Sequence, residues 1–409
     1  MKKFFVSLIA VLSCIAVSAA DNKVSASLYG FVTNQMYWQN RANYDAVDGL
    51  LNFIPKDESL NADGEDVNEQ FNSRMIAINT RLGLVLNGPE LLGAQTKAVV
   101  EGDFSTAGMC FFLRMAYIDF KWDRDKLLFG QTGHPMCTDL MPGTINIAIG
   151  SPFNALNRSP MLRYDHYFGE NKNWNLTGAA IYQFTSGKST GPNGMSNEYH
   201  SNCGIPELWA GINYTKKGFS IETGVDWLQL RPRTIDAATG RKVNEHYSSV
   251  SALLQLSYNK GKLSLRAKTL YGGDMSHLNL ASGYGVSAIH DDGSYEYAPL
   301  KVSSSWIFAS YGRTWKFGIL GGYMKNLGAS VDLVNPDELL WVYRGGQRNI
   351  DQMYRIAPQV EYYNGNFSLG LEYEMTTVAY GKVIESRGTV SDTHNVTNHR
   401  VMFVAKYSF

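Results

Sequence analysis

The sequence predicts an all-β fold: a transmembrane antiparallel β-barrel of sixteen strands with a constriction loop folded inward. Three observations predict it. The chain opens with an export signal, alternating apolar and polar stretches recur along its length, and the connections between them sort into short turns and long loops. About 9–11 residues of tilted strand cross a bilayer, which matches these stretches. Beyond the signal, no apolar run approaches the length of a transmembrane helix.

Residues 1–20 are the predicted signal peptide, and residues 21–409 are the predicted barrel. Lys2 and Lys3 precede an apolar run over 4–17, and small residues lead to cleavage after Ala20. Cys14 leaves a lipoprotein as the alternative, but the apolar run continues past it. The chain holds 37 basic and 37 acidic residues, so nucleic acid is excluded as a partner. An exported chain of this kind is expected in the bacterial outer membrane.

Sixteen alternating runs supply the predicted strands, with eighteen as the alternative count. The runs are 24–36, 71–87, 94–105, 111–122, 127–134, 158–168, 174–184, 207–216, 219–233, 246–259, 262–273, 299–313, 316–327, 351–363, 367–380 and 398–409. Seven short turns alternate strictly with eight long loops, and lie at 88–89, 123–126, 169–173, 216–218, 259–262, 313–314 and 364–366. Bacterial barrels place short turns in the periplasm and long loops outside.

The last run, HRVMFVAKYSF, predicts how the barrel closes. Phe403, Tyr407 and Phe409 alternate with polar residues and are expected to face lipid, while Arg400 and Lys406 face the lumen. The last strand must pair with the first, because an unpaired strand edge is not tolerated in lipid. The alternation ending on Phe409, with Tyr407 before it, resembles the C-terminal signal that the barrel assembly machinery recognises.

The lumen of such a barrel is too wide for wall side chains to fill, so a water-filled channel is expected. The segment after the fifth strand, residues 135–157 within 130–166, carries three prolines and several isoleucines. An outer loop with that much apolar surface would be unusual, so the segment is expected to fold inward as a constriction loop. Asp139 and Arg158 are its assigned charged residues.

Five short motifs occur in the order seen in DcaP-like outer-membrane porins, and the chain resembles that family most over about 70–170. They are TRLGL (80–84), VEGDF (100–104), LRMAY (113–117), LLFGQT (127–132) and LRYDH (162–166). The resemblance implies a homotrimeric porin for passive diffusion of small hydrophilic solutes, favouring anions such as carboxylates. The chain departs from some members because residues 21–23 leave no room for a periplasmic coiled coil before the barrel.

By position, the resemblance assigns Arg81, Arg114 and Arg163 to the barrel wall opposite the constriction loop. Strand alternation places Glu101 and Asp103 on the inner face as well. Two roles remain open for this group. The arginines attract anions into the channel, or they pair with the two carboxylates and stiffen the wall.

Other functions and sites are weaker. A gated specific transporter, an adhesin and a surface-exposed barrel enzyme are alternatives, but chain order shows no catalytic constellation, so no enzyme is predicted. His134 and His166 have no partner at metal-ligand spacing, so neither a metal nor a cofactor is predicted. The first long loop, 39–70, is rich in acidic residues. It is either solvated or bound to cations that bridge lipopolysaccharide.

The cysteines allow one disulfide. In the hairpin around 123–126, two residues that lie opposite each other should have numbers that sum to about 249. Cys110 and Cys137 sum to 247, so they are expected to lie near each other. An exported protein can form such a bridge, so a Cys110–Cys137 disulfide is a hypothesis, with two separate thiols as the alternative.

Overall fold

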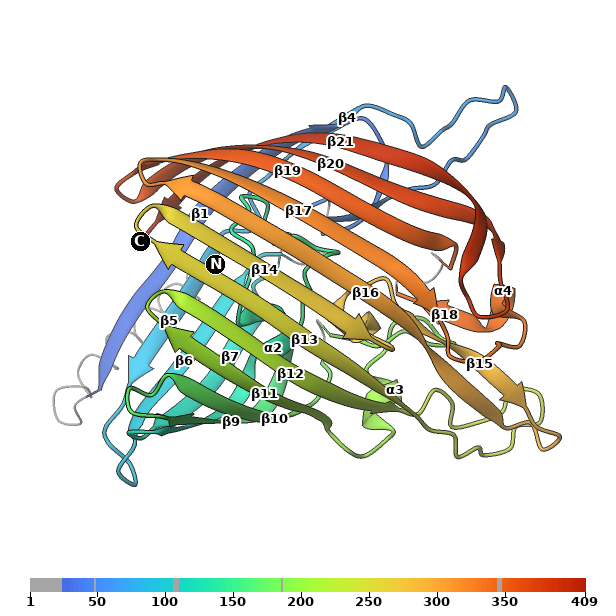
Figure 1. Cartoon of the computed structure of the whole chain (residues 1–409), viewed down its shortest axis with the longest axis horizontal. Helices are drawn as coiled ribbons and strands as arrows, with labels where there is room; N and C mark the ends of the chain where they lie inside the picture. The colour runs from blue at the N-terminus through green and yellow to red at the C-terminus, as the bar shows by residue number, and fades with distance from the viewer. Residues whose placement is uncertain (1–23, 48, 106–109, 185–186, 344–347) are drawn as a thin grey trace, which may run out of the picture.

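A computed structural model describes residues 24–47, 49–105, 110–184, 187–343 and 348–409, and the predicted signal peptide lies outside them. Within these residues, sixteen tilted strands form a closed antiparallel barrel, which confirms the predicted fold class (Figure 1). The second strand is broken into two pieces. In chain order the wall consists of β1 (Ser25–Gln39), β4 (Asn72–Ile76) with β5 (Arg81–Asn87), β6 (Gln95–Asp103), β7 (Phe112–Lys121), β8 (Asp125–Gly133), β9 (Arg158–Phe168), β10 (Trp174–Ile181), β11 (Glu207–Lys216), β12 (Phe219–Leu230), β13 (Tyr247–Lys260), β14 (Leu263–Gly272), β16 (Tyr295–Gly312), β17 (Trp315–Gly328), β19 (Ile350–Asn364), β20 (Phe367–Ile384) and β21 (Val390–Ser408).

The barrel closes where β1 meets β21, as predicted. Their register runs from Phe31 opposite Ser408 to Gln39 opposite Arg400. The backbone of Phe409 continues the pairing, because its N–H and C=O both bond to Gly30 at 3.0 Å. On its other side β1 pairs with β4 and β5. The ladder therefore leaves neither edge of the barrel sheet open within the described residues.

The connections sort as predicted. All seven short turns gather at one end of the barrel, and the long loops leave the other end (Figure 1). Small elements decorate these loops: β2 (Asn43–Ala46), β3 (Leu51–Pro55), α2 (Pro135–Thr138), α3 (Glu198–Ser201), η1 (Ser276–Leu278), β15 (Gly283–Ile289), α4 (Pro336–Leu339) and β18 (Leu340–Val342). None of the helices in the described ranges has the length and apolar character needed to cross a membrane.

The last hairpin is longer than predicted. β20 continues to Ile384 and β21 starts at Val390, whereas the expected strands were 367–380 and 398–409. The extra pairing runs from Gly381 opposite Thr393 to Ile384 opposite Val390. Outside the membrane, strands pair through their backbones and need no alternation of apolar and polar side chains. The polar ends of β20 and β21 therefore carried no signal that the alternation could reveal.

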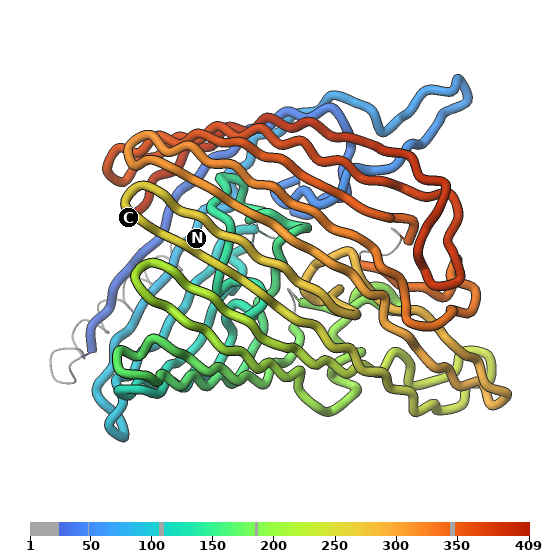
Figure 2. Tube along the Cα trace, viewed as in Figure 1, coloured from blue at the N-terminus to red at the C-terminus, as the bar shows by residue number. Residues whose placement is uncertain are grey.

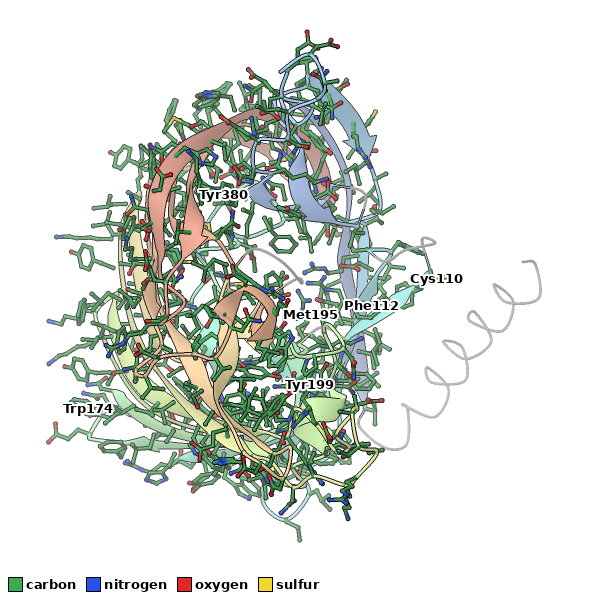
Figure 3. All side chains as sticks on the ribbon, turned by 90° about the vertical axis from the view of Figure 1, so that its right-hand side faces the viewer. Cys110, Phe112, Trp174, Met195, Tyr199 and Tyr380 are labelled. Carbon is green, nitrogen blue, oxygen red and sulfur yellow. The ribbon has the colours of Figure 1, made fainter. Side chains whose placement is uncertain are left out.

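Side chains alternate between the two faces of the wall. Apolar residues such as Leu82, Val100 and Phe403 are exposed on the outside, where lipid would cover them. Figure 3 looks into the barrel from its loop end and shows Trp174 at the outer margin and Met195 toward the interior. Tyr407 and Phe409 are 52% and 45% exposed, whereas Arg400 is buried inside. The predicted orientation of the last strand is therefore confirmed.

Candidate functional site: the lumen and its constriction loop

Residues 134–157, here called the constriction loop, leave the wall after β8 and fold into the barrel, as predicted (Figure 2). The loop begins with α2, whose first residue is Pro135. His134 is the N-cap of this helix, and its Nδ1 accepts a hydrogen bond from the Met136 N–H at 3.2 Å. Proline suits the first helical position because its missing N–H has no partner there. Met136, Phe153 and Ala155 are fully buried, so the apolar part of the loop forms the core of the molecule.

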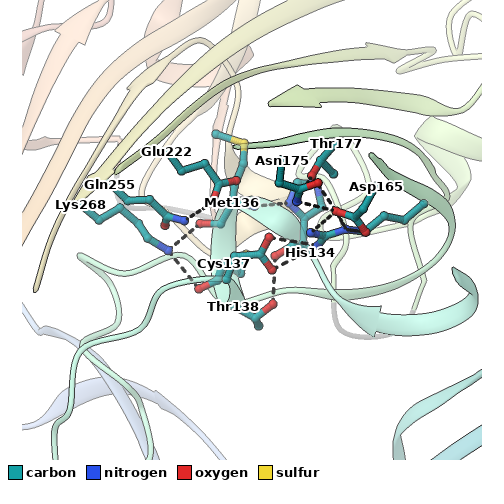
Figure 4. A network of polar contacts seen from close by, with 12 residues as sticks. His134, Met136, Cys137, Thr138, Asp165, Asn175, Thr177, Glu222, Gln255 and Lys268 are labelled. Carbon is teal, nitrogen blue, oxygen red and sulfur yellow. Dashed lines mark hydrogen bonds and ion pairs between the residues drawn. The ribbon is translucent and has the colours of Figure 1, made fainter. Parts of the chain in front are cut away.

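Side chains of the wall hold the constriction loop by its backbone carbonyls. Lys268 Nζ donates to the carbonyls of Met136 and Cys137 at 3.0 and 3.1 Å (Figure 4). Arg355 Nη1 donates to the carbonyl of Ser151 at 2.7 Å. Further bonds of the same kind come from Arg266 to Met141 O, Gln359 to Gly143 O and Ser304 to Phe153 O. The donors lie on β14, β16 and β19, so the loop is attached to one side of the barrel.

A group of paired charges lies on the opposite wall, on β5, β6 and β7. Arg114 donates from Nε to Glu101 at 2.9 Å and from Nη1 to Asp103 at 2.5 Å. Arg81 lies 3.6 Å from Glu101 and 3.8 Å from Asp103, with its guanidinium 5.0 Å from the centre of the Phe31 ring. The structure thus brings four of the predicted wall residues together.

A cavity of about 740 Å³ lies between this wall and the constriction loop. Among the described residues, the charged side chains that line it are Arg81, Arg114, Arg158, Lys188, Lys406, Glu101 and Asp103. Five cationic groups therefore face two carboxylates. Arg158, which was assigned to the loop, is the first residue of β9 and faces the cavity from the point where the loop rejoins the wall.

Asp139 lies in the constriction loop and Arg163 on the wall strand β9, as predicted, but neither lines the cavity. Arg163 pairs with Asp139 at 3.0 Å and with Asp165 at 3.0 Å. The two carboxylates bind the guanidinium from both sides, so it connects the loop to β9 and is not turned toward the cavity. This bridge is a structural link between the constriction loop and the wall.

The hairpin β2–β3 in the first long loop was not predicted to reach the lumen. Leu50, Phe53 and Ile54 are each 1% exposed, and Asn52 donates to Glu374 on β20 at 2.6 Å. The hairpin contributes Leu50, Leu51 and Phe53 to the cavity lining. The short apolar run LLNFI inside an acidic loop was the signal that could have revealed it. The acidic residues that follow it are largely exposed.

The hypothetical Cys110–Cys137 disulfide is wrong, because Cys137 is a free thiol. The strand register from which the disulfide was inferred is right. Ala116 pairs with Gln131, and the sum of these two residue numbers equals the sum for Cys110 and Cys137. However, β8 ends at Gly133 and the chain turns inward. Cys137 is consequently buried in α2, while Cys110 is exposed before β7.

In the folded protein at pH 8, we expect thiol reagents to modify Cys110 and leave Cys137 intact. Burial raises the pKa of Cys137 to about 12, so only about one ten-thousandth of that thiol is ionised at this pH. Mass spectrometry after alkylation, with and without denaturant, measures both sites. Modification of Cys137 without denaturant, or its appearance in a disulfide-linked peptide, would contradict this assignment.

Comparison with solved structures identifies the architecture. The outer-membrane channel DcaP of Acinetobacter baumannii shares 18% identity, covering 94% of this chain and 97% of that chain with a TM-score of 0.69. An anion-selective porin from Comamonas acidovorans (10% identity, 94% and 100% covered, TM-score 0.57) also matches. So does the in-vitro folded outer-membrane protein OmpT of Vibrio cholerae in its trimer form (9%, 94% and 99%, TM-score 0.54).

The chain has the fold of the outer-membrane porins. The resemblance to DcaP-like porins predicted from the five motifs is thus confirmed for the fold. No protein-family model and no curated protein matches the sequence.

Proposed function

We propose that this porin-fold protein is a channel of the bacterial outer membrane. It lets small hydrophilic solutes diffuse passively and favours anions such as carboxylates. The excess of five cationic groups over two carboxylates around the cavity beside the constriction loop carries the proposal. The closed barrel and the inward loop support it. The role needs neither catalysis nor a cofactor.

The electrostatic argument depends on which charges are already balanced. Glu101 and Asp103 both bind Arg114 directly, so Arg81, Arg158, Lys188 and Lys406 add positive charge that these carboxylates only partly offset. Two opposite charges about 4 Å apart attract by about 4 kcal/mol at an effective dielectric of about 20, before desolvation is counted. Rings of charge in a narrow pore select ions by this means.

Single-channel recording of the refolded protein tests the proposal. In a KCl gradient across a planar bilayer, we expect a steady conductance. We expect the reversal potential to be displaced from zero toward the equilibrium potential of chloride. A reversal potential on the potassium side would overturn the proposed preference for anions. A barrel that inserts but carries no steady current would instead favour a gated specific transporter.

We propose a homotrimer whose outer apolar band contacts outer-membrane lipid and lipopolysaccharide. The trimer form of the Vibrio cholerae protein supports this assembly for the shared fold. Mild detergent extraction followed by gel electrophoresis without heating should show a species of three chains that heating converts to monomer. A monomer under both conditions would contradict it.

Deleting Phe409 should lower the yield of folded barrel at least tenfold while export continues. The residue completes the closing ladder through two backbone bonds to Gly30, and with Tyr407 it forms the proposed signal for the barrel assembly machinery. Heat-modifiable protein in outer-membrane fractions provides the measurement. Phe409→Tyr keeps a terminal aromatic ring and serves as the control. A normal yield from the deletion would rule the signal out.

A further inference from the structure

Two histidines and two carboxylates form a buried cluster at the start of the constriction loop. His134 is the N-cap of α2, Glu207 begins β11, Asp226 lies on β12 and His277 lies in η1. The Nε2 atoms of His134 and His277 lie 2.7 and 3.1 Å from Glu207 Oε1. Asp226 Oδ1 lies 3.9 Å from His134 Nε2. The sequence analysis found no metal-ligand spacing at His134 because its neighbours come from distant parts of the chain.

Hydrogen bonds within the protein satisfy this cluster only in part. Glu207 Oε2, Asp226 Oδ1 and His277 Nδ1 are buried and have no hydrogen-bond partner. The side chains of Glu207 and His277 are 0% and 1% exposed, and that of Asp226 is 2% exposed. Two ionised carboxylates in so dry a place would cost several kcal/mol each unless a positive charge balanced them. One divalent cation supplies two positive charges.

We propose that this cluster binds a single zinc ion through His134 Nε2, His277 Nε2, Glu207 Oε1 and Asp226 Oδ1. The three atoms offered by His134, Glu207 and His277 already lie within 4.8 Å of one another. Two imidazole nitrogens and two carboxylate oxygens make a donor set that suits tetrahedral zinc, whereas Mg²⁺ and Ca²⁺ prefer oxygen ligands alone.

Binding requires the four ligand atoms to adjust their positions. Zinc–nitrogen and zinc–oxygen bonds of about 2.0–2.1 Å separate neighbouring ligand atoms by about 3.3 Å in a tetrahedron. The 2.7 Å and 3.1 Å contacts must therefore widen, and Asp226 Oδ1, which lies 3.9 Å from His134 Nε2, must move in toward the other three atoms. Histidine binds zinc as the neutral ring, so the proton on each coordinating Nε2 must shift to Nδ1. For His134 this breaks the bond from the Met136 N–H, whereas His277 Nδ1 has no hydrogen-bond partner to lose.

The site would strengthen a contact between two loops that already meet, since the Leu156 N–H donates to the carbonyl of Leu278 at 2.9 Å and Asn157 Nδ2 donates to the carbonyl of His277 at 3.0 Å. His134 begins the constriction loop and His277 lies in the loop between β14 and β15. A shared zinc ion would hold both against β11 and β12. This inference is independent of the solute that the channel carries.

Metal uptake by the folded protein tests the proposal. The barrel, purified without a polyhistidine tag and stripped with EDTA, is dialysed against zinc alone and analysed by elemental mass spectrometry. Cobalt titration followed by visible absorption reports tetrahedral coordination. We expect one zinc ion per chain and a tetrahedral cobalt spectrum.

Glu207→Gln and His277→Gln should each weaken zinc binding at least tenfold. His290→Gln is the control, because His290 is exposed and contacts one carboxylate, Glu296, at 3.1 Å. Heat-modifiable migration verifies folding of each variant, and the cobalt spectrum of the unaltered protein decides the matter if a variant fails to fold. Less than about one tenth of an ion per chain in the unaltered protein, or unchanged uptake by both folded variants, would overturn the proposal.

Discussion

Replacing Arg114 with alanine is expected to lower the free energy of unfolding of the barrel by about 3–5 kcal/mol. Arg114 is the direct partner of Glu101 and Asp103, whose side chains are 5% and 0% exposed. Breaking a buried ion pair from one side costs this much because a charge stays buried without its partner. Arg81 lies farther from both carboxylates, at 3.6 and 3.8 Å, and cannot fully replace it.

Urea unfolding of the refolded protein in detergent measures this loss. Arg124→Ala is the matched control, since Arg124 lies in a short turn, is 44% exposed and is 4.0 Å from its partner Asp123. Adding Glu101→Gln and Asp103→Asn to Arg114→Ala should recover part of the stability, because the buried charge is then removed. Equal stability of Arg114→Ala and Arg124→Ala would show that the wall pairs contribute little.

Converting Arg81, Arg158 and Lys406 to glutamine together should abolish most of the anion preference. Two cationic groups, Arg114 and Lys188, would then face the two carboxylates, so the charge around the cavity would be balanced. Arg114 is retained so that the direct ion pairs, and with them the fold, are kept. We expect the reversal potential in a KCl gradient to move close to zero.

A control triple variant changes Arg241, Lys242 and Lys382 to glutamine. These residues are exposed and do not line the cavity, yet the change in net charge is the same. The control should keep the reversal potential of the unaltered protein. If both triples shift it equally, overall charge and not the cavity sets selectivity. If neither triple variant shifts the reversal potential, the cationic groups around the cavity stabilise the barrel wall and do not select ions.

The wall of this barrel was predictable because it depends on local patterns. Alternation indicated the strands, short polar or glycine-containing segments between them indicated the turns, and the alternation ending at Phe409 indicated pairing between the ends of the chain. These signals arise because one face of each strand contacts lipid and the other faces the lumen, so apolar and polar residues alternate along the strand. The inward loop was predictable for the same reason, since its isoleucines and prolines do not suit an outer surface.

The interior was harder to predict because its contacts join distant parts of the chain. Nothing near Arg163 in the sequence indicates that Asp139 would bind it. The cluster at His134 depends on Glu207 and His277, which come from the start of strand β11 and from the loop between β14 and β15. The hairpin β2–β3 is held in the lumen by a hydrogen bond from Asn52 to Glu374, which is more than 300 residues away in the chain. Strand alternation contains no information on such partners.

The attachment of the constriction loop bears on how such a channel can diversify. The wall donors Lys268, Arg355 and Gln359 bind backbone carbonyls, which every amino acid possesses. Side chains of the loop can therefore be exchanged while these anchors persist, as long as the backbone path is kept. Evolution, or a protein engineer, could retune the opening by substitutions at Met141, Thr144 and Ile147, which face the cavity, without rebuilding the barrel that holds it.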